Sequence, residues 1–187
     1  MIPPLPFYQK RLDRFSEELT KTSHLVERYS VIRIFGFIIG LILLYFSTTF
    51  SLNIALVYFI CFATIFGSIV YHHSNLHKLK KNLTILKDIN KNEIAAIDGE
   101  FGHFNKGEEF INNANHYADD LDIFGTGSLF QYLDRTTTVS GKEKLAHWLA
   151  NQELNTEQIL LKQEAVKELV EKPEWRQNLQ LIGKKYR

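Results

Sequence analysis

The sequence predicts an all-α protein built around a two-helix transmembrane hairpin, and three observations predict it. Residues 34–71 contain no Asp, Glu, Lys or Arg, although charged residues make up 23% of the chain. Apolar residues recur at spacings of three and four on both sides of this segment, which is the period of an amphipathic helix. Helix-start signals return after residue 128. The net charge is only +1, and no segment has the sustained positive charge typical of a nucleic-acid-binding domain.

Residues 1–33 and 72–98 are each predicted to form a cytosolic amphipathic helix. Both helices leave the apolar segment on the same side of the membrane, so we expect them to pair. The alternative for the first helix is that it lies on the membrane surface. Gly99 is expected to end the second helix. The apolar positions are Leu12, Phe15, Leu19, Thr22, Val26 and Tyr29 in the first helix and Leu76, Leu79, Leu83, Leu86 and Ile89 in the second.

The uncharged segment 34–71 is too long for one crossing of a bilayer. As a straight helix it would measure about 57 Å, against a hydrocarbon thickness of about 30 Å. Ser and Thr residues with Asn53 cluster near its middle, so we predict two spans, 34–50 and 52–71, joined by a short turn. The alternative is a buried helix pair in a soluble protein. A signal peptide is disfavoured because the apolar run starts late and no small-residue cleavage site follows it.

Basic residues flank both ends of this hairpin, and the turn carries no charge. Arg28 and Arg33 precede the first span, and Lys78, Lys80 and Lys81 follow the second. The positive-inside rule therefore predicts that both chain termini are cytoplasmic.

Small residues predict how the two spans pack. Gly36 and Gly40 form one small-xxx-small pair, and Ala63 and Gly67 form another at similar depth. Such pairs allow close helix approach in lipid, so we expect them to face each other; the alternative is that they mediate dimerisation. No ionisable group lies mid-membrane, so the sequence gives no sign of a transport pathway.

Residues 99–127 are predicted to form an acidic connector, because residues 93–125 carry a net charge of −7. Asp119, Asp120 and Asp122 crowd together with His116 nearby, but their spacing lacks the ligand pattern and closing Glu of an EF-hand. We favour a solvated acidic loop over a metal site.

Two other polar clusters are candidates for a metal site or a phosphate site. His73 and His77 share one helix face beside His72, yet they lie where a membrane interface collects polar residues, so we favour that role over metal binding. Arg135 with residues 136–138 could contact phosphate, but a turn at a helix end is favoured. The sequence thus predicts no metal site, and no Ser-His-Asp or Cys-His arrangement is apparent.

Residues 128–187 are predicted to be helical. Residues 128–134 form a short helical turn, and Trp148 and Trp175 are expected to anchor the core. The apolar faces are only partly matched within the segment, so we expect the chain to be a fragment of a longer protein. The expected helix starts are Ser140 for a helix to about Asn151, Asn155 with Gln158 as a capping box for a helix to about Glu171, and Pro173 in the first turn of a last helix.

Residues 117–179 resemble the start of the core, or lever, domain of the MutS family of mismatch-repair ATPases. The resemblance lies in a Ser-Leu-Phe run, Leu-Asp-x-Thr-x-Thr, a Gly, Leu-x-x-Trp-Leu and a Gln-Glu-Ala-Val-x-Glu-Leu motif. It implies a structural role for the family core motif, which here is Leu129, Phe130, Leu133, Asp134, Thr136, Thr138, Gly141, Trp148 and Leu149.

The whole arrangement resembles the membrane-anchored MutS-like proteins of bacteria. This resemblance implies a bacterial inner-membrane location, a homodimer, and DNA contact through a portion outside this chain. It also implies an ATPase domain there that binds ATP and magnesium. No G-x-x-x-x-G-K-[ST] motif occurs in these residues, so we predict no cofactor-binding or catalytic residue within them and leave open whether the protein is an enzyme. The alternative function is a non-enzymatic membrane scaffold whose cytosolic helical domain, 128–187, docks a protein partner.

Overall fold

A computed structural model describes residues 4–111, 116–151 and 155–186, and these residues contain helices but no strand. The prediction of an all-α protein is therefore confirmed. The elements in order are α1 (Pro4–Phe50), α2 (Leu52–Ile97), the 3-10 helix η1 (Glu108–Phe110), α3 (His116–Asp120), α4 (Leu129–Leu133), α5 (Val139–Ala150), α6 (Thr156–Val170) and α7 (Pro173–Lys185).

The chain divides into two compact units. The first unit comprises residues 1–12 and 85–187, and the second comprises residues 13–84. Helices α1 and α2 each contribute residues to both units. The first unit therefore contains the start of α1, the end of α2 and every later helix.

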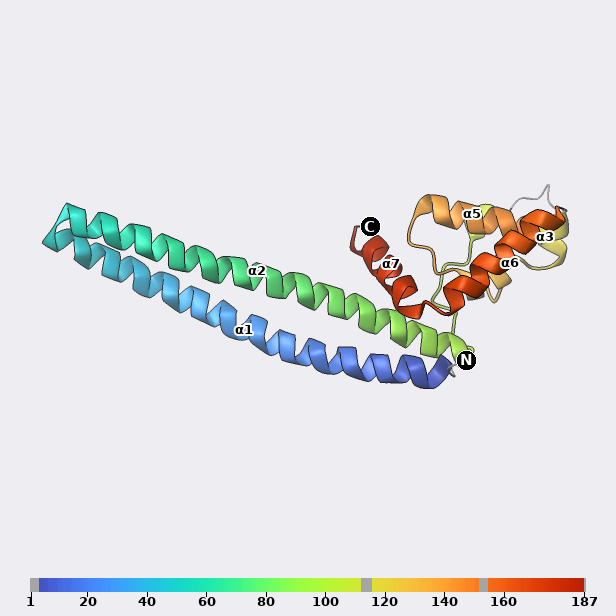
Figure 1. Cartoon of the computed structure of the whole chain (residues 1–187), viewed down its shortest axis with the longest axis horizontal. Helices are drawn as coiled ribbons and strands as arrows, with labels where there is room; N and C mark the ends of the chain where they lie inside the picture. The colour runs from blue at the N-terminus through green and yellow to red at the C-terminus, as the bar shows by residue number, and fades with distance from the viewer. Residues whose placement is uncertain (1–3, 112–115, 152–154, 187) are drawn as a thin grey trace. The chain divides into compact units, whose positions relative to one another are not determined.

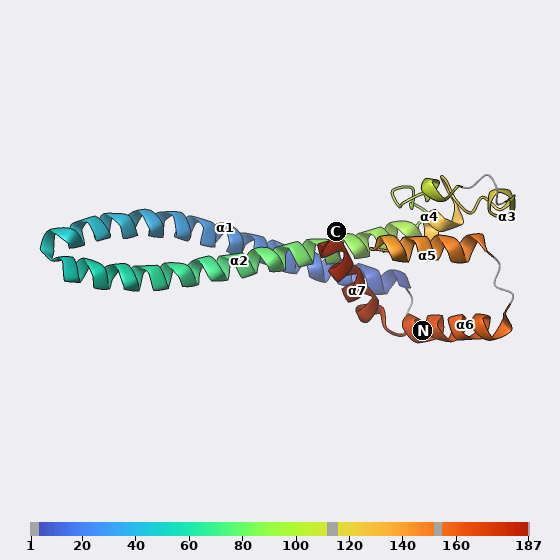
Figure 2. The same ribbon diagram turned by 90° about the horizontal axis from the view of Figure 1, so that it is seen from above.

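The second unit is a helical hairpin in which α1 and α2 lie side by side, as Figures 1 and 2 show from two directions. Only Ser51 separates the two helices, so the predicted break falls within the polar cluster. The hydroxyls of Ser47, Thr48 and Thr49 donate to backbone carbonyls three residues earlier, each at 2.7 Å. These bonds satisfy polar groups that would otherwise be costly in an apolar environment.

Most apolar side chains of the hairpin are not buried within this chain. The most apolar 18-residue windows of α1 and α2 have mean hydropathies of 2.1 and 2.2, and only 6% of each window is buried. Both helices are long and apolar enough to cross a membrane. A core helix pair of a soluble protein would be mostly buried, and this pair is not buried by the rest of its own chain.

The predicted amphipathic helices are continuous with the apolar spans. On α1, Thr22 and Val26 are buried, and Leu83 is buried on α2, as the expected pairing requires. Helix α2 ends at Ile97, just before the predicted stop at Gly99, whose φ of 85° is left-handed. The amide of Glu100 then donates to the carbonyl of Ala95 at 2.7 Å, which closes the last turn.

An aromatic cluster holds the connector to α4 in the first unit. Phe130 is fully buried, and its ring centroid lies 5.7 Å from that of Phe110 and 5.4 Å from that of Phe124. A Cβ at Gly107 would lie 2.7 Å from the Phe130 ring, and φ at Gly107 is 67°, so this position requires glycine on two grounds. Packing against Phe130 therefore holds the connector at Gly107, Phe110 and Phe124.

Most predicted helix starts are confirmed. The side chain of Ser128 caps α4, the side chain of Asn155 accepts from the amides of Glu157 and Gln158 to cap α6, and Pro173 opens α7. The prediction for α5 was wrong, because Thr138 rather than Ser140 is the N-cap and accepts from the amide of Gly141. Thr138 has the extended backbone that an N-cap needs, whereas Ser140 is already helical.

The expectation that both tryptophans anchor the core was also wrong. Trp148 is 49% exposed and Trp175 is 53% exposed. The Trp148 ring instead lies under two ammonium groups, with its centroid 5.6 Å from Lys144 Nζ and 5.2 Å from Lys162 Nζ. Cation–π contact allows a large ring to remain at the surface.

Candidate functional site

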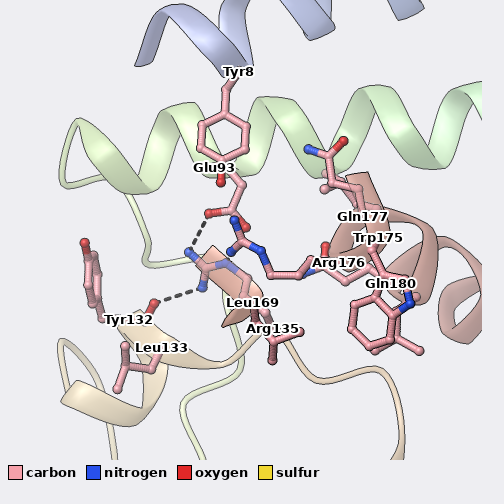
Figure 3. A pocket seen from close by; sticks show the side chains of 12 residues that line it. Tyr8, Glu93, Tyr132, Leu133, Arg135, Leu169, Trp175, Arg176, Gln177 and Gln180 are labelled. Carbon is pink, nitrogen blue, oxygen red and sulfur yellow. Dashed lines mark hydrogen bonds and ion pairs between the residues drawn. The ribbon is translucent and has the colours of Figure 1, made fainter. Parts of the chain in front are cut away.

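A cavity of about 370 Å³ lies in the first unit, where segments far apart in the sequence converge. Its walls come from the start of α1, the end of α2, the α4 region, the end of α6 and α7. Figure 3 shows Tyr8, Glu93, Arg135 and Arg176 directed toward one another within it. The lining residues are Tyr8, Ile89, Glu93, Tyr132, Leu133, Arg135, Leu169, Trp175, Arg176, Gln177, Leu179 and Gln180.

Arg135 occupies the centre of this convergence. Its Nε donates to Glu93 Oε1 at 2.7 Å and its Nη2 to Glu93 Oε2 at 3.3 Å, so the ion pair is bidentate (Figure 3). Its Nη1 donates to the carbonyls of Tyr132 and Asp134, and its guanidinium lies 4.0 Å from the centroid of the Phe104 ring. This planar fork therefore joins α2 to the segment after α4, a geometry that lysine could not reproduce.

A tight turn after α4 positions Arg135. The Asp134 carboxylate accepts from the Thr136 amide at 2.8 Å and from its hydroxyl at 2.6 Å. Asp134 is only 8% exposed, so these bonds satisfy a nearly buried charge. The turn leads directly into the Thr138 cap of α5. The Leu-Asp-x-Thr-x-Thr part of the family core motif thus includes a tight turn.

Side-chain amides form a second connection between α2 and α7. Gln177 Nε2 donates to Asn90 Oδ1 at 2.8 Å, and both residues are buried. Gln177 Oε1 accepts from Arg11 Nε at 2.8 Å, and Arg11 also pairs with Glu174 at 2.9 Å. The chain of contacts ties the start of α1 and the end of α2 to the same face of α7.

The electrostatics of the cavity are set by two guanidiniums and one carboxylate. Burial raises the pKa of the Tyr8 phenol, with the Glu93 carboxylate adding to the rise, while Arg176 and Arg135 oppose it. The buried Arg176 Nε has no hydrogen-bond partner among the described residues. The lining contains no Ser, Thr, Cys or His, so the cavity offers no conventional nucleophile–base pair.

In the three described ranges, no group of three or more His, Cys, Asp or Glu residues is arranged to hold a metal ion. Asp119, Asp120 and Asp122 are exposed, and the side chain of His116 lies outside the described residues. His73 and His77 make a close pair, with their Nε2 atoms 3.1 Å apart.

Comparison with known proteins identifies the segment that carries this cavity. The family model of MutS domain III matches residues 81–185. The chain belongs to the MutS domain III family. No curated protein and no solved structure matches the chain. The MutS domain III match extends the resemblance at 117–179 on both sides, and it starts inside α2.

The MutS domain III segment places the family core motif in several environments. Phe130 is fully buried, Leu133 lines the cavity, Asp134 and Thr136 make the turn, and Thr138 with Gly141 starts α5. Leu129 and Trp148 are about half exposed, and Leu149 is partly exposed. The structural role of this motif as a set stays a prediction.

Sequence reasoning missed Glu93, Arg176 and the Asn90–Gln177 bond. A signal for Asn90 was present, because it follows Ile89 on the apolar face of α2 and lies four residues after Leu86. A buried amide on such a face requires a partner, although the sequence does not say which one. Glu93 and Arg176 gave no comparable local signal.

The glycines predicted to pack the transmembrane spans have different surroundings. Gly40 is buried against the ring of Phe62, and its carbonyl accepts from the Tyr58 hydroxyl at 3.2 Å. A Cβ at Gly36 or Gly67 would meet nothing within 4 Å. The predicted facing of the Gly36/Gly40 and Ala63/Gly67 pairs therefore stays a prediction.

Proposed function

We propose that this chain is the membrane-tethering part of a MutS-family DNA-binding ATPase. The observation that carries the proposal is the composition of α2. This one helix, Leu52–Ile97, contains an apolar stretch long enough to cross a bilayer and also the first residues of the MutS domain III match at 81–185. ATP and magnesium would bind an ATPase domain outside these residues, and DNA would bind through that missing portion.

Covalent and packing connections support the tethering role. No loop separates the apolar stretch of α2 from the part that holds Asn90 and Glu93. In the first unit, Arg11 from α1 and Asn90 from α2 bond the same residue of α7, Gln177. Within the first unit, the start of α1 and the end of α2 are thus both bonded to α7.

We place the two spans in a bacterial inner membrane with both termini in the cytoplasm. The charge distribution supports this orientation, because basic residues flank both spans and the Ser51 turn is uncharged. We expect the whole protein to act as a homodimer.

Cysteine labelling tests the membrane topology, because Cys61 is the only cysteine and can be replaced by serine. In that background, Ser51→Cys should react with a membrane-impermeant maleimide on intact cells, since the turn faces outward. Lys78→Cys should react only after the inner membrane is opened. Labelling of Lys78→Cys in intact cells would reverse the orientation, and labelling of neither variant under any condition would contradict the hairpin.

The alternative is a membrane scaffold that docks a protein partner, and exposed apolar residues on α6 and α7 favour it. Leu160, Val166 and Ile182 are each more than half exposed. The gene's reading frame discriminates between the two functions. Continuation into a P-loop ATPase, with DNA-stimulated ATP hydrolysis by the longer protein in detergent, supports the ATPase tether. A longer protein whose hydrolysis no DNA stimulates supports the scaffold.

A further inference from the structure

An open groove lies on the hairpin, between α1 and α2. Its volume is about 390 Å³, and its lining is apolar except at Arg33. Phe37 and Phe66 meet across it with ring centroids 5.5 Å apart. The full lining is Arg33, Ile34, Phe37, Ile38, Phe66 and Val70, which we call the hairpin groove.

Contacts between the helices bound the hairpin groove along its length. Beyond Arg33, the Ser30 hydroxyl lies 3.4 Å from His73 Nε2. Beyond Ile38, the ring of Phe62 covers Gly40, and the Tyr58 hydroxyl bonds the Gly40 carbonyl. The helices thus meet on either side of an apolar hollow, and its lining side chains Phe37 and Ile38 are 44% and 49% exposed. An elongated apolar group would bury this surface.

The charged residues that flank the groove in the sequence are all basic. Between Glu27 and Asp88 the sequence contains no acidic residue, but it contains six basic ones: Arg28, Arg33, Lys78, Lys80, Lys81 and Lys87. Arg33 is the basic residue that lines the groove, and it directly precedes the first predicted span. A guanidinium at this depth lies level with phospholipid headgroups, where it can make charge-assisted hydrogen bonds to a phosphate.

We propose that the hairpin groove binds an anionic phospholipid, with one acyl chain against Phe37, Ile38 and Phe66 and the phosphate at Arg33. The inference rests on the proposed insertion of the hairpin into a membrane. Charge complementarity identifies the occupant, because a neutral or zwitterionic lipid would leave the positive charge of this end uncompensated. Basic pockets between transmembrane helices on the cytoplasmic side are suited to such headgroups.

Native mass spectrometry of the full chain tests this site. The delipidated protein in detergent is mixed with equal amounts of dioleoyl phosphatidylglycerol and dioleoyl phosphatidylcholine, and the bound lipids are counted. We expect phosphatidylglycerol adducts to dominate. Arg33→Gln should lower the ratio of bound phosphatidylglycerol to phosphatidylcholine by about fivefold, the factor that corresponds to about 1 kcal/mol for one basic residue at a membrane surface.

Matched variants separate the groove from general charge and bulk. Arg28→Gln removes the same charge from an exposed position outside the groove and should lower the ratio clearly less than Arg33→Gln does. Ile38→Trp should fill the hollow and reduce all bound lipid, whereas Ile39→Trp, on a neighbouring residue outside the lining, should not. Equal effects of Arg33→Gln and Arg28→Gln, or of the two tryptophan variants, would overturn the proposal.

Failure of this site and failure of membrane insertion give different results. If the protein requires detergent but binds both lipids equally, the hairpin groove is not selective and membrane insertion stands. If the protein stays monodisperse without detergent and retains no lipid, membrane insertion itself fails.

Discussion

Two ionisable side chains, Glu93 and Arg135, join parts of the chain that are 42 residues apart. Both are mostly buried, with side-chain exposures of 18% and 24%. In such a setting the cost of leaving one charge unpaired exceeds the gain from a typical surface pair. The ion pair is therefore a residue-scale determinant of how α2 meets the turn after α4.

Glu93→Gln tests this role. The substitution leaves Arg135 without its carboxylate, so we expect a loss of about 2 kcal/mol in the free energy of unfolding of the first unit. Chemical denaturation of the full chain in detergent, followed by the near-ultraviolet signal of Trp148 and Trp175, measures it. Glu168→Gln is the control, because Glu168 pairs with Lys172 at an exposed surface and should show no measurable change. Equal stability of the two variants would refute the role of the pair.

The lowered pKa of His73 predicts, also at the residue scale, that the stability of the hairpin depends on pH. Burial lowers its pKa, and the nearby His77 and Arg33 act in the same direction, while Ser30 is its neutral neighbour. The unfolded chain, with an ordinary histidine pKa of about 6.5, therefore binds a proton that the folded chain does not. Stability of the hairpin should fall as pH drops below about 6.5 toward the lower folded pKa.

Thermal unfolding between about pH 7.5 and about pH 5.5 measures this loss. His73→Gln should flatten the pH dependence over that window, whereas His24→Gln, at an exposed position on α1, should not. A pH dependence that survives His73→Gln would assign the effect to another group.

At the scale of single elements, the starts of α4, α5 and α6 are each capped by one polar side chain. The Thr138 hydroxyl accepts from the Gly141 amide at 3.1 Å and so caps α5. Sequence reasoning favoured Ser140, because serine and threonine are both good caps and the pattern does not fix which of them has extended backbone. The backbone decides the choice, because Thr138 is extended whereas Ser140 already lies within α5.

Thr138→Ala should therefore destabilise α5 by about 1 kcal/mol. Thr138→Ser should restore the stability, because it keeps the hydroxyl. Ser140→Ala should change little. Amide hydrogen exchange at the first turn of α5 measures all three, and greater exchange in Ser140→Ala than in Thr138→Ala would restore the sequence-based assignment.

Glycine positions in the hairpin make a second element-scale prediction. Gly40 is covered by Phe62, whereas Gly36 has open space around it. Gly40→Leu should weaken the hairpin by forcing α1 and α2 apart, at a cost of about 1–3 kcal/mol. Gly36→Leu should leave hairpin stability unchanged. Resistance of each variant to unfolding in dodecyl sulfate measures the difference, and a larger loss from Gly36→Leu would contradict the packing seen here.

The sequence predicted the elements more completely than their contacts. The break near Ser51, the end of α2 just before Gly99 and the starts of α4, α6 and α7 follow from local chemistry, so they were predicted correctly. The cavity around Arg135 was not predicted, because Glu93, Arg135 and Arg176 come from three segments that only the tertiary fold brings together. The prediction that Trp148 and Trp175 anchor the core was wrong for a related reason. The size of a ring does not show whether the tertiary fold buries it.

At the scale of the whole molecule, α2 joins an apolar hairpin to a MutS domain III segment. The match at 81–185 establishes the family, and the two long apolar helices permit membrane insertion. The central claim is that the hairpin inserts in a bilayer and so holds the MutS segment at the membrane. Every proposal about orientation and lipid depends on this insertion.

Fractionation after an alkaline carbonate wash tests that claim most directly. Cells producing the full chain are lysed, the membranes are washed to remove peripheral proteins, and the pellet and supernatant are compared after ultracentrifugation. A matched variant lacks residues 34–71. We predict that the full chain stays in the membrane pellet until detergent is added and that the variant appears in the supernatant. Release of the full chain by the carbonate wash would contradict the account.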